Sequence, residues 1–76
     1  MYIPVAESRQ VLFNLERGGD QFRCDLIRRN EGWFAELFKN GAYDHRIGGP
    51  FEAKEDATEA AETERGAIDR GEMDGW

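Results

Sequence analysis

Three short turn signals at regular spacing constrain this chain more than any other feature. Each contains glycine and lies between segments rich in aromatic and aliphatic residues: Gly18-Gly19-Asp20, Asn30-Glu31-Gly32 and Asn40-Gly41. Sequences of this kind favour the tight turns that join antiparallel strands. The pattern therefore predicts four short strands in a meander, at residues 10–17, 21–28, 33–38 and 42–47.

A helix is expected after the last strand. Residues 53–70 are rich in Ala and Glu and contain no Pro, and Gly71 is placed to end the helix in a left-handed conformation. Pro50 fixes the entry to the helix. No Ser, Thr, Asp or Asn stands at the expected N-cap, and Gly66 costs about 1 kcal/mol relative to Ala inside a helix.

The 76 residues are expected to form one domain, spanning residues 1–76. Its predicted fold class is α+β: a small antiparallel meander of three to four strands with one C-terminal helix packed on one face. Residues 1–7 and 72–76 show no periodicity and are expected to be mobile.

Turn lengths predict which residues share a face of the sheet, because residues directly opposite one another point to the same side. A two-residue loop at Gly18-Gly19 and a four-residue loop from Arg29 to Gly32 gather the apolar residues on one inner face. The predicted pairs on that face are Leu15 with Phe22, Phe13 with Cys24, Val11 with Leu26, Leu26 with Ala35, and Cys24 with Leu37.

The third turn leaves two alternatives. A three-residue loop, Lys39-Asn40-Gly41, places Tyr43, His45 and Ile47 on the inner face, whereas a two-residue Asn40-Gly41 loop places them on the other face. We prefer the three-residue loop because it joins Ile47 to the apolar set. Small side chains at helical spacing are expected to cover the inner face: Ala57, Ala60, Ala61, Glu64, Ala67 and Ile68.

The opposite, outer face is unusually apolar for a face exposed to water, and contiguous apolar patches mark partner surfaces. It is predicted to bind a protein or a second copy of the chain, unless Tyr2, Ile3 and Val5 fold back over it. Arg23 is predicted to stack on Phe38 there. The candidate binding residues are Leu12, Arg23, Ile27, Phe34, Glu36, Phe38 and Arg46.

The formal charge is −6, from 16 acidic and 10 basic residues, and the region after Ile47 supplies the excess of acid. Five of these acids recur at helical spacing on the predicted exposed side: Glu52, Glu55, Asp56, Glu59 and Glu62. This acidic stripe either docks on a basic surface, as a row of phosphates would, or only keeps the protein soluble.

No catalytic or metal-binding motif is present. Cys24 and His45 are predicted to lie on strands separated by a third, and Asp44 is predicted to point away from His45, which argues against an enzyme. No acidic spacing indicates a metal, and no cofactor is expected. A single cysteine and the lack of about 20 successive apolar residues favour the reducing cytoplasm and argue against a membrane span.

Three segments carry a resemblance to a known pattern: Trp33-Phe34-Ala35-Glu36-Leu37, Ile47-Gly48-Gly49-Pro50-Phe51, and Lys54 to Ala61. They resemble the sheet-plus-helix DNA-binding domains of plant ethylene-response factors and the N-terminal arm-binding domains of phage integrases. The resemblance implies that the outer face lies in a DNA groove, with Glu36 and Arg46 on the groove-facing side and Arg23 and Arg28 on the preceding strand. Phe38 stands where those families have a basic residue.

The leading hypothesis is a non-catalytic protein-binding module, a small bacterial or phage-encoded regulator or inhibitor. The alternative is a nucleic-acid-binding domain that uses Arg23, Arg28, Arg29 and Arg46 with Phe34 and Phe38 as stacking surfaces. The negative charge of the chain favours the protein partner or self-association over nucleic acid.

Overall fold

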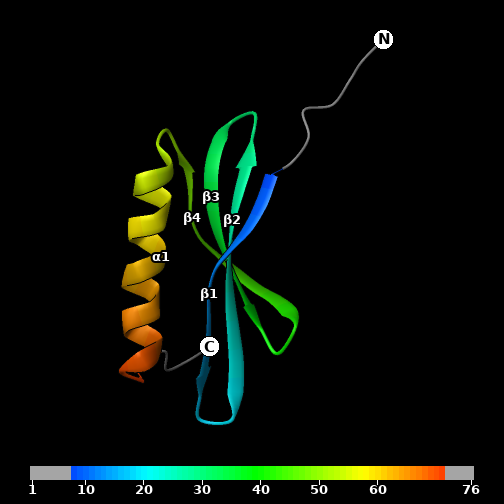
Figure 1. Cartoon of the computed structure of the whole chain (residues 1–76), viewed down its shortest axis with the longest axis vertical. Helices are drawn as coiled ribbons and strands as arrows, with labels where there is room; N and C mark the ends of the chain where they lie inside the picture. Colours follow the sequence, from blue (N-terminus) through cyan, green and yellow to red (C-terminus); the bar gives the residue numbers. More distant parts are fainter. Residues whose placement is uncertain (1–7, 72–76) are drawn as a thin grey trace.

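The computed structural model describes residues 8–71, which form one four-stranded sheet and one helix (Figure 1). The elements are β1 (Ser8–Arg17), β2 (Asp20–Arg29), β3 (Gly32–Lys39), β4 (Ala42–Phe51) and α1 (Lys54–Asp69). The strands are antiparallel and lie in sequence order, which confirms the predicted α+β meander with a C-terminal helix. The expectations for residues 1–7 and 72–76 lie outside the described residues.

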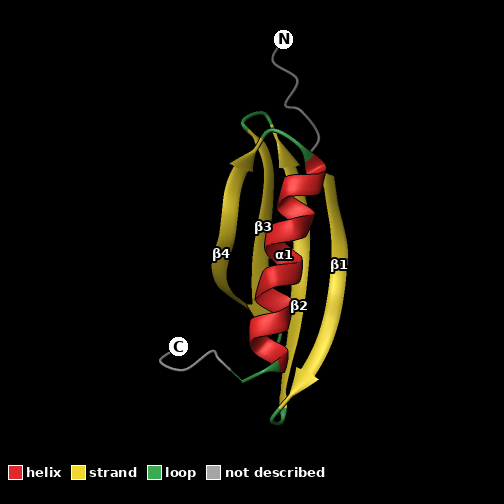
Figure 2. Cartoon of the chain, turned by 90° about the vertical axis from the view of Figure 1, so that its left-hand side faces the viewer, coloured by secondary structure: helices red, strands yellow, loops and turns green. Residues whose placement is uncertain are grey.

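Helix α1 lies along one face of the sheet (Figure 2). Ala57, Ala61 and Ile68 are its buried residues, as the predicted stripe requires, and their small or compact side chains let the helix approach the strands. No side chain caps the helix at Ala53, and Gly71 follows its end with a φ of +72°, both as expected. The core beneath the helix contains Phe13, Phe22, Cys24, Ala35, Leu37, Ala61 and Ile68.

The first turn follows the prediction. The second keeps the predicted register but not the predicted length, because Arg29 pairs with Gly32 and the loop is the two residues Asn30-Glu31 rather than the four from Arg29 to Gly32. Gly18 and Gly19 both have positive φ and form a two-residue loop, and β2 pairs with β3 in the predicted register. The third turn differs from the prediction. Lys39 pairs with Ala42, so Asn40-Gly41 is a two-residue loop and the preferred three-residue loop is wrong.

Asn40 explains the shorter third loop. Its φ is +53°, and its side-chain oxygen accepts a hydrogen bond from the backbone nitrogen of Gln21 at 2.9 Å. Its side-chain nitrogen donates to Asp20 at 3.0 Å. These bonds tie the turn to the start of β2 and hold Asn40 in the left-handed conformation that a two-residue hairpin loop needs.

A bulge at Leu12 changes the face of the sheet to which the side chains at the start of β1 point. Phe13 pairs with Cys24, but Val11 pairs with Asp25, so Leu12 is an extra residue. The predicted pairing of Val11 with Leu26 is therefore wrong. Val11 lies on the outer face, 48% exposed, while Leu12 packs against the helix-side core.

A second bulge, at Asp44, changes the facing of β4. Phe38 pairs with Tyr43 and Leu37 pairs with His45, so Asp44 is the extra residue. Tyr43 consequently lies on the outer face, which corrects the prediction. His45 stands opposite Leu37, and it reaches the inner face as predicted, as does Ile47.

Candidate functional site

Four arginine side chains lie over the outer face of the sheet. They are Arg9, Arg23, Arg29 and Arg46, and we call them the arginine cover. The residues in the middle of this face are as inaccessible as a core, although α1 packs on the other side: Asp25 (1% exposed), Ile27 (0%), Phe34 (2%) and Glu36 (6%).

The arginine cover rests on two aromatic rings. The guanidinium carbons of Arg46 and Arg29 lie 4.3 and 5.5 Å from the ring centroid of Phe34. Those of Arg23 and Arg9 lie 4.3 and 6.0 Å from the centroid of Phe38. Guanidinium groups attract aromatic faces, and their long stems cover apolar surface while the charged heads stay in water. The predicted stacking of Arg23 on Phe38 is confirmed.

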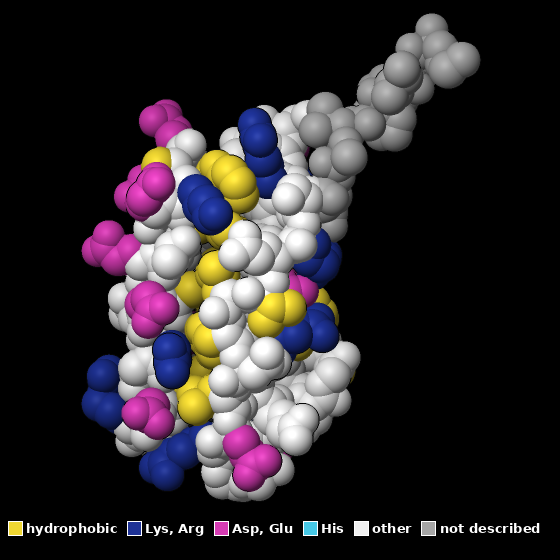
Figure 3. Space-filling view, viewed as in Figure 1, with side chains coloured by type: hydrophobic (Ala, Val, Ile, Leu, Met, Phe, Trp, Pro, Cys, Tyr) yellow, Lys and Arg dark blue, Asp and Glu magenta, His cyan; other side chains and the backbone are white. Residues whose placement is uncertain are grey.

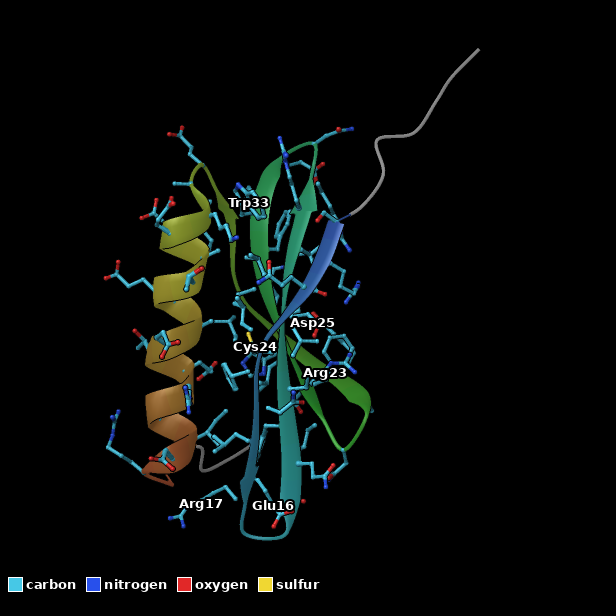
Figure 4. All side chains as sticks on the ribbon, viewed as in Figure 1. Glu16, Arg17, Arg23, Cys24, Asp25 and Trp33 are labelled. Carbon is cyan, nitrogen blue, oxygen red and sulfur yellow. The ribbon has the colours of Figure 1, made fainter. Side chains whose placement is uncertain are left out.

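Two buried carboxylates hold Arg9, Arg23 and Arg46 from below. Asp25 accepts hydrogen bonds from Arg9 Nη1 and from Arg23 Nε, both at 2.9 Å. The Asp25 side chain is 2% exposed, whereas Arg9 and Arg23 are 41% and 39% exposed. Glu36, also buried, lies 3.7 Å from Arg46. The acids are therefore beneath and the guanidinium groups are at the surface, on the side of the sheet where Figure 4 shows Arg23 beside Asp25.

The structure brings most of the predicted binding residues together. Arg23, Ile27, Phe34, Glu36, Phe38 and Arg46 share the outer face. Leu12 does not, because the β1 bulge turns it toward the helix-side core. Arg28 does not either, since it pairs with Trp33 and its guanidinium carbon lies 5.5 Å from that ring on the inner side.

Sequence reasoning missed Arg9 and Tyr43 as parts of this face. In a regular strand Arg9 would share the inner face with Phe13, and only the bulge moves it to the outer face beside Asp25. Tyr43 is 56% exposed, and its ring meets that of Phe38 edge-on at a centroid distance of 5.8 Å. No local residue pattern marks either position.

The acidic stripe is exposed as expected, with every member on the surface: Glu52, Glu55, Asp56, Glu59 and Glu62. Glu52 precedes α1, and the other four are on it. Acidic side chains are spread along the helix side of the molecule (Figure 3). Because α1 covers the inner face, the acidic stripe and the arginine cover lie on opposite sides of the sheet.

His45 connects β4 to the helix. Its Nδ1 lies 2.7 Å from Asp44 and its Nε2 lies 2.9 Å from Glu64 on α1. The prediction that Asp44 points away from His45 is wrong, because the bulge at Asp44 breaks the alternation of β4. Partial burial lowers the pKa of His45, but hydrogen bonds to the two carboxylates outweigh it, and the pKa lies above the ordinary 6.5.

Cys24 lies away from this histidine. Both residues stand opposite Leu37, so β3 runs between their strands, as predicted. Burial, together with the negative charge of Asp25, raises the pKa of the Cys24 thiol to about 12. A thiol with this pKa stays protonated at neutral pH and is a poor nucleophile.

Within residues 8–71 no three histidine, cysteine or carboxylate side chains gather as a metal site requires. Helix α1 has neither the length nor the apolar composition that crossing a bilayer takes. No known protein family matches the chain, and neither a curated protein nor a solved structure is found to be similar to it.

Proposed function

We propose that this chain is a non-catalytic binding module whose outer face binds an acidic surface of another protein. One observation carries the proposal: the arginine cover presents guanidinium groups at the surface, while the neutralising carboxylates of Asp25 and Glu36 lie buried beneath them. At the arginine cover, a partner meets positive charge and aromatic side chains before it meets Asp25 or Glu36.

The geometry of the arginine cover suits carboxylate recognition. Arg23 and Arg46 are held by an aromatic ring on one side and a carboxylate at their edge, so little side-chain entropy remains to be lost on binding. Arginine pairs with carboxylates through two parallel N–H donors, and arginine and tyrosine are frequent in binding hot spots. Tyr43, exposed beside Phe38, adds an aromatic anchor at the margin.

The net charge of −6 does not oppose this contact. The acidic stripe lies on the far side of the sheet, and physiological salt screens charges beyond about 8 Å. Such a module acts as a regulator or inhibitor by occupying its target, which needs no cofactor and no enclosed substrate cavity.

Nucleic acid binding is the second candidate, supported by arginine–aromatic stacking on the same face and by the resemblance to ethylene-response and integrase domains. Two features weaken it. Phe34 is covered by Arg46 and Arg29, so a base cannot stack on its ring without displacing them. Arg28, one of the four arginines that this hypothesis needs, lies on the other side of the sheet.

A nuclear magnetic resonance titration tests the proposal with two probes, a poly-glutamate peptide and a mixed-sequence single-stranded DNA. We expect the peptide to shift the side-chain Nε signals of Arg23 and Arg46, and Arg46→Lys to weaken its binding several-fold by removing the paired donors. Arg65→Lys on α1 is the matched control and should leave binding unchanged.

Peptide shifts confined to α1, or the lack of any shift, would refute binding by the outer face. DNA binding that is tighter than peptide binding and falls steeply with salt would replace the leading proposal with the second candidate.

A further inference from the structure

The two edges of the sheet differ in how well they accept another strand. Edge strands expose unpaired backbone N–H and C=O groups. β4 shifts register against β3 at three places, and Pro50 near its end has no N–H to donate. β1 has ten residues and a single shift, at Leu12. The edge of β1 is therefore the one suited to further pairing.

We propose that β1 pairs with β1 of a second copy of this chain, antiparallel and about a two-fold axis that passes between Leu12 and Phe13. In this register Arg9 stands opposite Glu16 of the second copy, and Val11 stands opposite its Asn14. The two four-stranded sheets join into one continuous sheet, with both helices on the same side.

The bulge at Leu12 makes this register possible. Arg9 and Val11 lie on the outer face before the bulge, and Asn14 and Glu16 lie on the outer face after it. Opposite residues of an antiparallel pair must share a face. In a regular strand Arg9 and Glu16, separated by an odd number of positions, would lie on opposite faces, and the bulge corrects this mismatch.

Charge complementarity fixes the second copy as the occupant. The pairing brings Arg9 to Glu16 twice, once on each side of the axis, and like charges do not meet within it. Strand β1 has two basic residues, Arg9 and Arg17, and one acidic residue, Glu16, so it lacks the excess of acid found on α1. Val11, a large apolar residue at 48% exposure, lies next to the axis and is covered by pairing.

Charge reversal tests the register. We expect the wild type to dimerise in sedimentation velocity at micromolar concentrations, and Arg9→Glu or Glu16→Arg alone to weaken the dimer about tenfold or more by placing like charges opposite each other. The double variant Arg9→Glu/Glu16→Arg should recover dimerisation. Lys54→Glu and Glu59→Arg, which change the net charge equally from α1, should have little effect.

The double variant separates this role from the contact of Arg9 with Asp25. That contact is lost in Arg9→Glu and stays lost in the double variant, so only a partner at Glu16 explains recovery. Circular dichroism shows whether each variant folds. If Arg9→Glu does not fold, cysteine cross-linking tests the same register.

For cross-linking, a Val11→Cys variant is mixed with an Asn14→Cys variant under mild oxidation. Their β-carbons are expected to lie about 5 Å apart, so the mixture should form a disulfide that neither variant forms alone. Cys24 is buried and does not compete. A monomeric wild type, a dimer that ignores both reversals, single-variant losses without recovery, or cross-linking of either variant with itself would each overturn the proposal.

Discussion

The two faces of this sheet reach the same degree of burial by different means. On the inner face, Cys24 and Leu37 are fully buried under an alanine-lined helix. On the outer face, Ile27 and Phe34 are equally buried, and the Arg46 side chain that lies over the Phe34 ring remains partly exposed itself. A packed helix closes its face permanently, whereas side chains that rotate individually protect apolar residues and still offer charge to a partner.

The largest effect is expected from Phe34→Ala, which asks whether the arginine cover makes a true core. Removing a fully buried phenylalanine leaves a cavity, and we expect the free energy of unfolding to fall by about 3 kcal/mol, similar to Leu37→Ala on the inner face. Phe38→Ala, at a half-buried position, should cost about 1 kcal/mol. Urea unfolding followed by circular dichroism measures all three. Phe34→Ala could instead lower the free energy of unfolding no more than Phe38→Ala does, while Leu37→Ala lowers it several-fold more. That result would show that the arginine side chains do not bury Phe34 in solution.

Ala61→Leu tests the other face. Ala61 is 1% exposed between α1 and the sheet, so added methylenes force overpacking and should destabilise the fold by about 2 kcal/mol. Glu62→Leu, its exposed neighbour on the helix, should change stability by less than about 0.5 kcal/mol. Thermal and urea unfolding of the pair give the comparison, and equal small effects would contradict the observed packing of the helix.

Asp25→Asn weakens the arginine cover from below without changing side-chain size. The charge-assisted hydrogen bonds from Arg9 and Arg23 are lost, and we expect the free energy of unfolding to fall by about 1.5 kcal/mol. The loss is limited to this size because water can hydrate both partly exposed arginines. High salt should lower the stability of the wild type more than that of the variant. Asp69→Asn on α1 is the control, and an equal cost there would show that Asp25 contributes only through net charge.

The smallest effect is expected from His45, which links β4 to the helix on the inner side. The pKa of His45 is raised in the folded protein. The stability that protonated His45 contributes is therefore fully present below its unfolded pKa of 6.5, and it is lost as the pH rises through the folded pKa. We expect this contribution to the free energy of unfolding to be less than about 1 kcal/mol, because the ring is about a third exposed. Unfolding free energies from pH 6 to pH 9 should fall in the wild type and stay flat in His45→Gln, and a wild type that gains stability over this range would contradict the ion pairs.

Local chemistry made much of the fold predictable. Gly18-Gly19 specified the first hairpin loop, the β2–β3 register followed from the apolar pairs, and the alanine spacing placed Ala57 and Ala61 against the sheet. These features depend on residues close together in the sequence. The predicted outer face was correct for Arg23, Phe34 and Phe38 for the same reason.

The errors in which side chains share a face come from two bulges and from one turn. Neither Leu12 nor Asp44 is a glycine or any other residue that marks a bulge, so the extra residue has no sequence signal. The length of the third loop depends on Asn40 contacting Asp20 and Gln21, which belong to another hairpin. In β4 the shorter loop and the bulge offset each other, and His45 therefore returned to the predicted face.

The Cys24 thiol can report how often the core of the molecule opens. It is the single cysteine of the chain, it lies on a central strand, and its side chain is fully buried. With a pKa of about 12, only about 10⁻⁵ of such thiols are ionised at pH 7 even before burial excludes an alkylating reagent. Alkylation therefore requires an opening that exposes Cys24, and its rate measures how often the inner face opens.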